Sequence, residues 1–208
     1  MNGFFIVIEG IDGCGSTTQC KILADRLIEK GYKVHSTAEP SGSKAGKLLR
    51  EYLKDKNAPI PTDALLFAAD RAEHYHNEIL PKIKECFIVI SDRYIESSIA
   101  YQVAQSCDDF NISVEWVLAI NKFIEFPDLT IVLDVDVKQA LSRKKKDEEL
   151  EKFEKNDFLS KVSDVFIKRA KGNGDYIIQG SGSIEETALL VSTIVDSKLM
   201  DLKMALKK

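Results

Sequence analysis

The stretch Gly10-Ile11-Asp12-Gly13-Cys14-Gly15-Ser16-Thr17-Thr18 decides the fold of this chain. The apolar run FFIVI at residues 4–8 precedes it, and residues 19–29, whose apolar positions recur with helical periodicity, follow it. Strand, glycine-rich turn and helix in this order are the context of a phosphate-binding loop, because glycines let backbone amides turn inward at a helix N-terminus. We therefore predict that residues 10–18 cradle the phosphates of a nucleotide.

One position of this loop departs from the usual pattern G-x-x-x-x-G-K-[ST]. Gly10, Gly15 and Thr17 match the pattern, but Ser16 stands where the pattern has lysine. The alternative interpretation is a glycine-rich turn between a strand and a helix in some other α/β protein. Agreement at the remaining pattern positions and in both flanks favours the phosphate loop.

Length and composition set the broad class of the protein. The chain has 208 residues, 30% of them charged, and a net charge of −4, so we expect one domain and neither nucleic acid nor a membrane as a partner. Its four cysteines show no paired spacing, which is typical of reduced cysteines in a cytoplasmic protein. Residues 4–8 are too few for a signal peptide, and no apolar run approaches the ~18 residues of a membrane span.

Strands alternate with helices along the chain. Further strands are predicted at 32–38, 87–91, 129–135 and 176–178, and helices at 44–53, 63–84, 95–104, 113–126 and 158–170. Thr62 is the predicted N-cap of helix 63–84, which Pro81 is expected to kink or end, and Ser183 with Glu186 predicts a final capped helix. This alternation predicts a three-layer α/β sandwich of the P-loop NTPase type, with five parallel strands between helices.

Polar motifs follow two of the predicted strands. Glu39-Pro40 comes after strand 32–38, and Asp92-Arg93-Tyr94 comes after strand 87–91. Ligands of open α/β sheets bind at the carboxyl ends of the strands, so we expect both motifs to lie beside the phosphate loop. The alternative for Asp92 is a structural aspartate of a loop.

A run of charges occupies residues 143–155 and begins Arg143-Lys144-Lys145-Lys146. Such a run is commonly the solvated face of a helix. The functional alternative is a small helical lid that places cations on the nucleotide phosphates. With this lid at about residues 143–155, we expect residues 1–208 to form a single domain.

The order of these motifs resembles that of the thymidylate kinase family, which phosphorylates dTMP to dTDP with ATP and Mg²⁺. Five blocks match in register: residues 9–19, Glu39-Pro40, LLFAADR at 65–71, DRY at 92–94 with SSIAYQ at 97–102, and PDL at 127–129. The resemblance extends over residues 4–170 and is weaker beyond. It implies that residues 10–18 bind ATP.

The resemblance also implies an acceptor site for dTMP. Phe67 would stack on the thymine ring, and Arg71, one helical turn further, would bond a base carbonyl. Arg93 would hold the acceptor phosphate, for which the planar fork of a guanidinium is suited. The other implied acceptor contacts are Glu39, Arg50, Ser98, Tyr101 and Gln102. Core packing for Phe67 and an exposed position without a ligand for Arg50 stay open as alternatives.

Catalysis in this family needs no general base, because the attacking phosphate oxygen of dTMP is already anionic. In-line positioning and charge neutralisation remain as the catalytic tasks. The resemblance implies that Asp12 faces the sugar and phosphate of the acceptor and that Thr17 and Asp92 bind Mg²⁺. Asp12, Asp92 and Arg93 are therefore expected to be catalytic residues. The alternative for Asp12 is an aspartate that caps its own turn.

Ser16 deprives the loop of the cation that tracks the transferred phosphoryl group. Gly13, in place of a basic residue, resembles the family subtype whose catalytic cation comes from the lid. We therefore hypothesise that Arg143 and Lys144 supply the missing charge.

Two other functions stay open from the sequence. One is phosphorylation of a different deoxynucleoside or deoxynucleotide by the same fold. The other is nucleotide binding by a P-loop protein with little transferase activity, because the loop lysine is absent. The resemblance further implies a homodimer formed through the two predicted helices that follow Tyr94.

Overall fold

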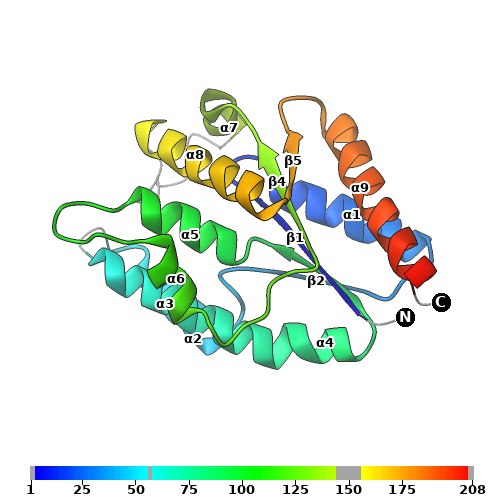
Figure 1. Ribbon diagram of the computed structural model, residues 1–208, viewed down its shortest axis with the longest axis horizontal. Helices are drawn as coiled ribbons and strands as arrows, with labels where there is room; N and C mark the ends of the chain where they lie inside the picture. Colours follow the sequence, from blue (N-terminus) through cyan, green and yellow to red (C-terminus); the bar gives the residue numbers. More distant parts are fainter. Residues whose placement is uncertain (1–2, 56–57, 144–155, 206–208) are drawn as a thin grey trace.

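The computed structural model describes residues 3–55, 58–143 and 156–205. Five strands form one parallel sheet with the order β2-β3-β1-β4-β5 (Figure 1). The strands are β1 (Phe4–Gly10), β2 (Val34–Ala38), β3 (Ile88–Asp92), β4 (Leu129–Asp134) and β5 (Tyr176–Gln179). The predicted α/β fold is therefore confirmed, and each strand lies within two residues of its predicted position.

Helices cover both faces of this sheet. They are α1 (Ser16–Glu29), α2 (Lys44–Tyr52), α3 (Ile60–His74), the π-helical turn η1 (Tyr75–Ile79), α4 (Leu80–Lys84), α5 (Ile95–Ala104), α6 (Val114–Ile120), α7 (Val137–Arg143), α8 (Asn156–Asn173) and α9 (Ile184–Ala205). In Figure 1, α1 and α9 lie together on one side of the sheet, and α5 and α8 lie together on the other, with α3 against α5 and α4 against β3.

The central strand β1 explains where the phosphate loop lies. All seven of its residues are buried, as expected for a parallel strand with helices on both faces. Phe5 and Val7 pack in the cluster that includes Ile95 of α5, whereas Ile6 and Ile8 pack in the cluster that includes Leu23 of α1. The carboxyl end of β1 therefore delivers the loop to the middle of one sheet edge.

The helix predicted at 63–84 differs from the observed one. It begins at Ile60 with Pro59 as its N-cap, so the prediction of Thr62 as the cap is wrong. Pro61 lies in the first turn, which suits proline because its ring presets φ and the first helical amides need no partner within the helix. Pro81 does not end the helix: the turn η1 precedes it, and α4 continues to Lys84. A π-helical turn is a common way to accommodate a break in the ladder of hydrogen bonds.

The helix predicted at 113–126 is much shorter in the structure and ends at Ile120. Asn121 explains this ending. Its Nδ2 donates to the carbonyl of Val117 at 2.8 Å, and its Oδ1 accepts from Arg71 at 2.8 Å. The segment that follows is irregular and leaves Phe123 and Phe126 exposed. A buried polar contact from another helix, which local periodicity does not encode, fixes this boundary.

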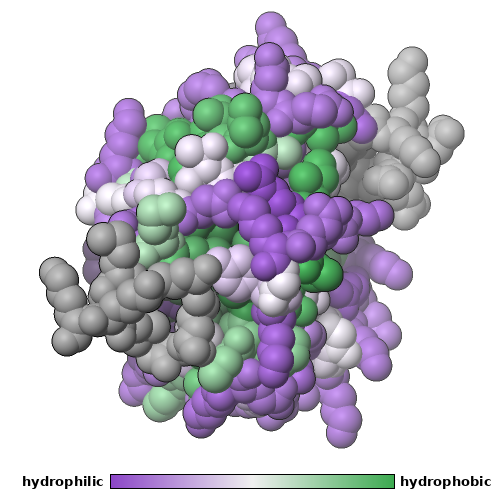
Figure 2. All heavy atoms as spheres, turned by 90° about the vertical axis from the view of Figure 1, so that its right-hand side faces the viewer, coloured by the Kyte–Doolittle hydropathy of each residue, from purple (hydrophilic) through white to green (hydrophobic). Residues whose placement is uncertain are grey.

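The final helix begins as predicted. The amide of Glu186 donates to the hydroxyl of Ser183, and the amide of Ser183 donates to the carboxylate of Glu186, which completes the capping box. Within the described residues, no helix combines the length and the low charge that crossing a bilayer requires. Apolar and hydrophilic side chains alternate over the face drawn in Figure 2.

The close approach of the backbone of Ser41 to Gly46 allows this packing to be tested. A side chain at Gly46 of α2 would place its Cβ 2.2 Å from the carbonyl oxygen of Ser41 and 2.7 Å from Asp70. A Cβ at Gly42 would meet nothing within 4 Å. We predict that Gly46→Ala destabilises the protein by about 1–3 kcal/mol, as overpacking does, and that Gly42→Ala changes stability by less than about 1 kcal/mol. Urea unfolding of both variants measures this, and equal midpoints would contradict the packing.

Candidate functional site

The loop after β1 has the geometry of a phosphate cradle. Gly13 and Gly15 have φ values of 81° and 97°, and Gly15 is the N-cap of α1. These left-handed conformations favour glycine. Because the first amides of a helix have no partner within it and carry partial positive charge, the start of α1 is suited to phosphate oxygens.

Helix α7 packs directly against this loop. A Cβ at Gly13 would lie 2.3 Å from the carbonyl oxygen of Ala140, so no side chain fits there. A Cβ at Gly15 would meet only Arg143, at 4.0 Å. The contact between α7 and the loop thus requires glycine at position 13 and excludes a basic residue.

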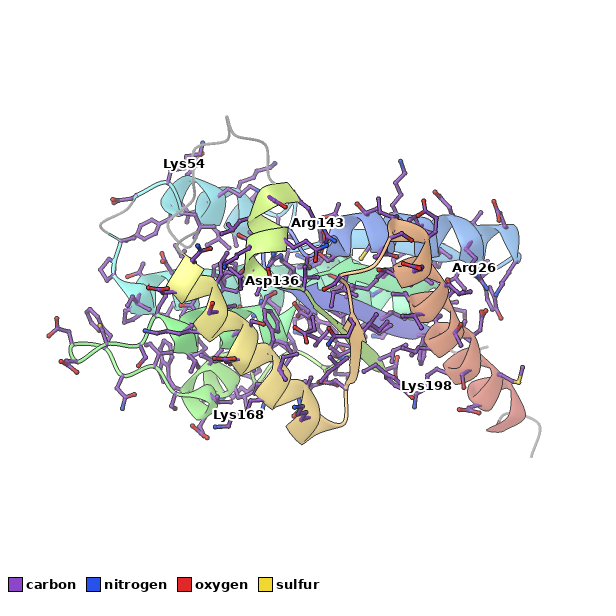
Figure 3. The ribbon with its side chains drawn as sticks, turned by 90° about the horizontal axis from the view of Figure 1, so that it is seen from above. Arg26, Lys54, Asp136, Arg143, Lys168 and Lys198 are labelled. Atoms are coloured by element: carbon purple, nitrogen blue, oxygen red, sulfur yellow. The ribbon has the colours of Figure 1, made fainter. Side chains whose placement is uncertain are left out.

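Arg143, the last residue of α7, brings a positive charge to the loop. Its Nη1 donates to the carbonyl of Cys14 at 3.2 Å, and its Nη2 donates to the carbonyl of Gly180 at 3.2 Å. Figure 3 shows the labelled Arg143 where α7 approaches the start of α1. Lys144, the second predicted lid cation, and the remainder of the lid at 144–155 lie outside the described residues.

Thr17 and Asp92 meet at the start of α1. The Thr17 hydroxyl donates to Oδ2 of Asp92, and Oδ1 of Asp92 is buried with no partner among the described residues. Mg²⁺ prefers oxygen ligands and is commonly held by one or two protein groups together with substrate phosphates and water. These two side chains beside the phosphate cradle fit that requirement. The described residues contain no cluster of three or more His, Cys, Asp or Glu side chains that could hold a metal ion.

A pocket with a cavity volume of about 120 Å³ opens beside the loop. Eight of the residues singled out from the sequence line it: Asp12, Glu39, Phe67, Arg71, Arg93, Ser98, Tyr101 and Gln102. Pro40, Leu53, Tyr94 and Ser97 complete the lining. The structure therefore brings together side chains from the segments that follow β1, β2 and β3 and from helices α3 and α5, at one edge of the sheet.

Arg93 lies between the loop and the pocket. Its Nη2 donates to Oδ1 of Asp12, and its guanidinium lies 5.4 Å from the centre of the Tyr101 ring. Although burial lowers the pKa of Arg93, the neighbouring Tyr101 hydroxyl and Asp12 carboxylate hold it well above its ordinary value. The Tyr101 hydroxyl also accepts from the amide of Asp12 at 2.9 Å. A permanent positive charge is thus fixed beside the phosphate loop.

Arg71 is the largest fully buried side chain in the described structure, with 1% of its surface exposed. Its Nη2 donates to Glu39 at 2.7 Å and to Ser98 at 2.8 Å, and its Nη1 donates to Asn121 at 2.8 Å. Its Nε is buried and has no partner among the described residues. These bonds hold the guanidinium in place and leave its Nε without an acceptor among the described residues.

Gln102 adds two further unsatisfied groups to the same pocket. Its side-chain oxygen and nitrogen are both buried, and neither has a hydrogen-bond partner in the described structure. Buried polar groups are nearly always paired, so orphaned groups that line a pocket point to a ligand or ordered water. A planar ring with donors and acceptors on its edge suits such a set.

One predicted contact does not reach the pocket. Arg50 donates to the carbonyls of Ser41, at 2.6 Å, and of Pro40, and it is absent from the lining residues. It supports the loop after β2 instead.

His74, whose Nδ1 lies 3.2 Å from Glu39, was not identified in the sequence analysis. Because His74 follows Arg71 by three residues on one helix, the two side chains share a helix face, and this spacing could have indicated their proximity.

Comparison with known proteins agrees with this geometry. The family model for thymidylate kinase matches residues 8–189. A relative from Pyrobaculum calidifontis is 44% identical over 200 residues, covering 96% of this chain and 99% of the relative. Another, from Pyrococcus horikoshii, is 40% identical over 210 residues, covering 97% and 100%. Both are named probable thymidylate kinase, and the chain belongs to the thymidylate kinase family.

Proposed function

We propose that this chain transfers the γ-phosphoryl group of ATP in line to the phosphate of dTMP, giving ADP and dTDP, where the loop and the pocket meet. ATP-dependent phosphorylation of dTMP accords with the family to which the chain belongs. The observation that carries the proposal is the position of Arg93, which contacts Asp12 of the phosphate loop and lines the acceptor pocket.

On the acceptor side, each role follows from the pocket. Arg93 binds the dTMP phosphate with its planar donors, and Phe67 stacks on the thymine ring. The orphaned Nε of Arg71 and the amide of Gln102 bond the edge of the base. Tyr101 is buried, and its hydroxyl accepts from the amide of Asp12, so we assign its ring to the sugar side of the pocket, where it would crowd a 2′-hydroxyl. This set favours a deoxyribonucleotide with a pyrimidine base.

On the donor side, the amides of the loop and of the start of α1 bind the phosphates of ATP. Thr17 and Asp92 would hold Mg²⁺, which when bound would supply positive charge to the nucleotide phosphates. The attacking oxygen belongs to the dTMP phosphate, so the chain supplies no general base. Its contribution is to align the two phosphates and surround them with donors.

The charge that Ser16 does not provide comes from the lid side of the loop. Arg143 already contacts the loop through the carbonyl of Cys14. We place Arg143, and Lys144 beyond it, near the transferred phosphoryl group when the nucleotide is bound. A guanidinium supplied from outside the loop stabilises transition-state charge in other phosphoryl-transfer enzymes.

We further propose that the enzyme acts in the cytoplasm as a homodimer. The surface around α6 supports the second point, since Phe123 and Phe126 are 71% and 59% exposed. Val117 and Ile124, from the same region of the chain, are instead buried in the chain's own core. The interface proposed here therefore involves the two phenylalanines in place of those two residues.

The substrate assignment is tested with purified protein, Mg²⁺ and ATP against dTMP, dUMP, dCMP and thymidine. We expect ADP formation to be fastest with dTMP, because stacking on Phe67 and bonds to the base edge select the base. Coupled ADP detection measures the rates. Faster phosphorylation of thymidine would indicate a nucleoside kinase, and tight ATP binding without transfer to any acceptor would indicate a nucleotide-binding protein.

The origin of the catalytic charge is tested at Arg143. We predict that Arg143→Ala lowers kcat by on the order of 10²-fold, because it removes a preorganised charge from the transferred group. Ser16→Lys in the Arg143→Ala background should restore part of that loss, since it returns the usual cation. Lys168→Ala on α8 serves as a control. Wild-type turnover of Arg143→Ala would contradict this assignment.

A further inference from the structure

Glu9 of β1 has a buried carboxyl group, and neither donor nor acceptor binding as described above uses it. Its side chain is fully buried, and it accepts hydrogen bonds from the amide of Tyr94 at 2.9 Å and from the amide of Ser97 at 3.2 Å. The N-cap residue of α5, Tyr94, makes no side-chain cap of its own. Glu9 therefore caps α5 from a neighbouring strand, taking up amides that the first turn leaves unpaired.

A second contact links Glu9 to Arg93. The Ser97 hydroxyl donates to Oε2 of Glu9 at 2.5 Å and accepts from Nη1 of Arg93 at 3.3 Å. A serine hydroxyl has one proton to donate. Because that proton is directed to the carboxylate, the lone pairs of Ser97 face Arg93. Arg93 therefore donates to the hydroxyl of Ser97, and this hydroxyl in turn donates to Glu9.

The backbone of Arg93 depends on the same strand. Its φ is 72°, a left-handed conformation that is costly for any residue with a side chain. The amide of Arg93 donates to the carbonyl of Ile8 at 3.0 Å, and its carbonyl accepts from the Ser91 hydroxyl at 2.7 Å. Ile8 and Glu9, adjacent on β1, therefore hold the main chain and, through Ser97, the side chain of Arg93.

We propose that Glu9 is a positioning residue for the dTMP phosphate: through Ser97 it sets the orientation in which Arg93 meets the acceptor. This inference rests on the proposed function, because it requires that Arg93 binds that phosphate. β1 would then align both reaction partners, since the phosphate loop continues from one end of it and Glu9 orients Arg93.

Burying the ionised carboxylate of Glu9 lowers the stability of the fold, which supports a role for this residue other than stabilisation. Burial raises the pKa of Glu9 to about 7, although the Ser97 hydroxyl and Arg93 act to lower it, and Glu96 raises it further. Cys20 of α1 also lies within electrostatic range. Because this pKa is raised from 4.5 to about 7, Glu9 lowers the stability of the fold progressively as the pH rises through that interval, and the full cost is present at pH 8. A neutral glutamine of the same shape should therefore fold at least as well at pH 8.

Glutamine at position 9 also tests the direction of the hydrogen bonds. If its oxygen accepts from the two amides, its NH₂ group faces Ser97 and donates to the hydroxyl that Arg93 needs. Ser97→Ala removes the link while leaving the two amide bonds of Glu9 in place. The matched control is Glu96→Gln, because Glu96 lies beside Ser97 on α5 but pairs with Arg169 at 2.8 Å, away from the pocket.

The experiment measures kcat, KM for dTMP and for ATP, and the melting temperature at pH 8 for these variants. We expect Glu9→Gln and Ser97→Ala each to raise KM for dTMP by about tenfold, because a misplaced binding group loses much of its effect, with KM for ATP changed less than about twofold. The double variant should have a KM for dTMP no higher than that of the more affected single variant, because both substitutions break the same link. Glu96→Gln should lower the melting temperature without changing KM for dTMP.

Three results would overturn the proposal: an unchanged KM for dTMP in either folded variant, an equal rise in KM for ATP, or additive effects in the double variant. Ser97→Ala decides the question if Glu9→Gln does not fold. Arg93→Met separates this proposal from the function on which it rests. If Arg93→Met raises KM for dTMP and the Glu9 and Ser97 variants do not, only the positioning role fails. If wild-type protein leaves dTMP unphosphorylated, the proposed function fails first.

Discussion

The parallel pairing of β1 with β3 is the constraint on which the site depends. In this register Ile8 lies opposite Asp92, so the two strands end side by side. The phosphate loop and the Asp92-Arg93-Tyr94 turn must therefore meet, and Thr17 reaches Asp92 while Asp12 reaches Arg93. A slip of one residue would turn the side chains of a strand to the opposite face of the sheet. The buried, tightly packed residues of β1 prevent that slip.

Charge, more than shape, distinguishes this site from an ordinary P-loop. With Ser16 in place of lysine, Arg143 is the described cation that contacts the loop carbonyl of Cys14, and Arg93 contacts Asp12 from the acceptor side. The close approach of α7 to Gly13 provides a structural reason for this arrangement. Because the backbone of α7 occupies the space beside position 13, a basic side chain does not fit there, and Arg143 at the end of α7 brings a positive charge to the loop instead.

The sequence predicted the sheet and most of the pocket because both depend on local patterns. Continuous apolar runs marked the buried parallel strands, and polar residues at their carboxyl ends marked the ligand edge. Contacts between distant elements were not predictable in this way. Helix α6 ends at Ile120, before Asn121, which accepts a hydrogen bond from Arg71. His74 lies against Glu39, and Arg50 donates to the backbone of the loop after β2 and does not line the pocket. Glu9, at the end of an apolar run, gave no sign of the three donors that surround it.

The central claim is that the loop and the pocket lie in line across Asp12 and Arg93, so that one ligand can fill both. The most direct measurement is the binding, by calorimetry, of a compound that joins adenosine to thymidine through a chain of phosphates. If the two sites are aligned, linking the nucleotides should strengthen binding by at least about 10²-fold over ADP or dTMP alone. Binding no tighter than that of the better single nucleotide would contradict the account.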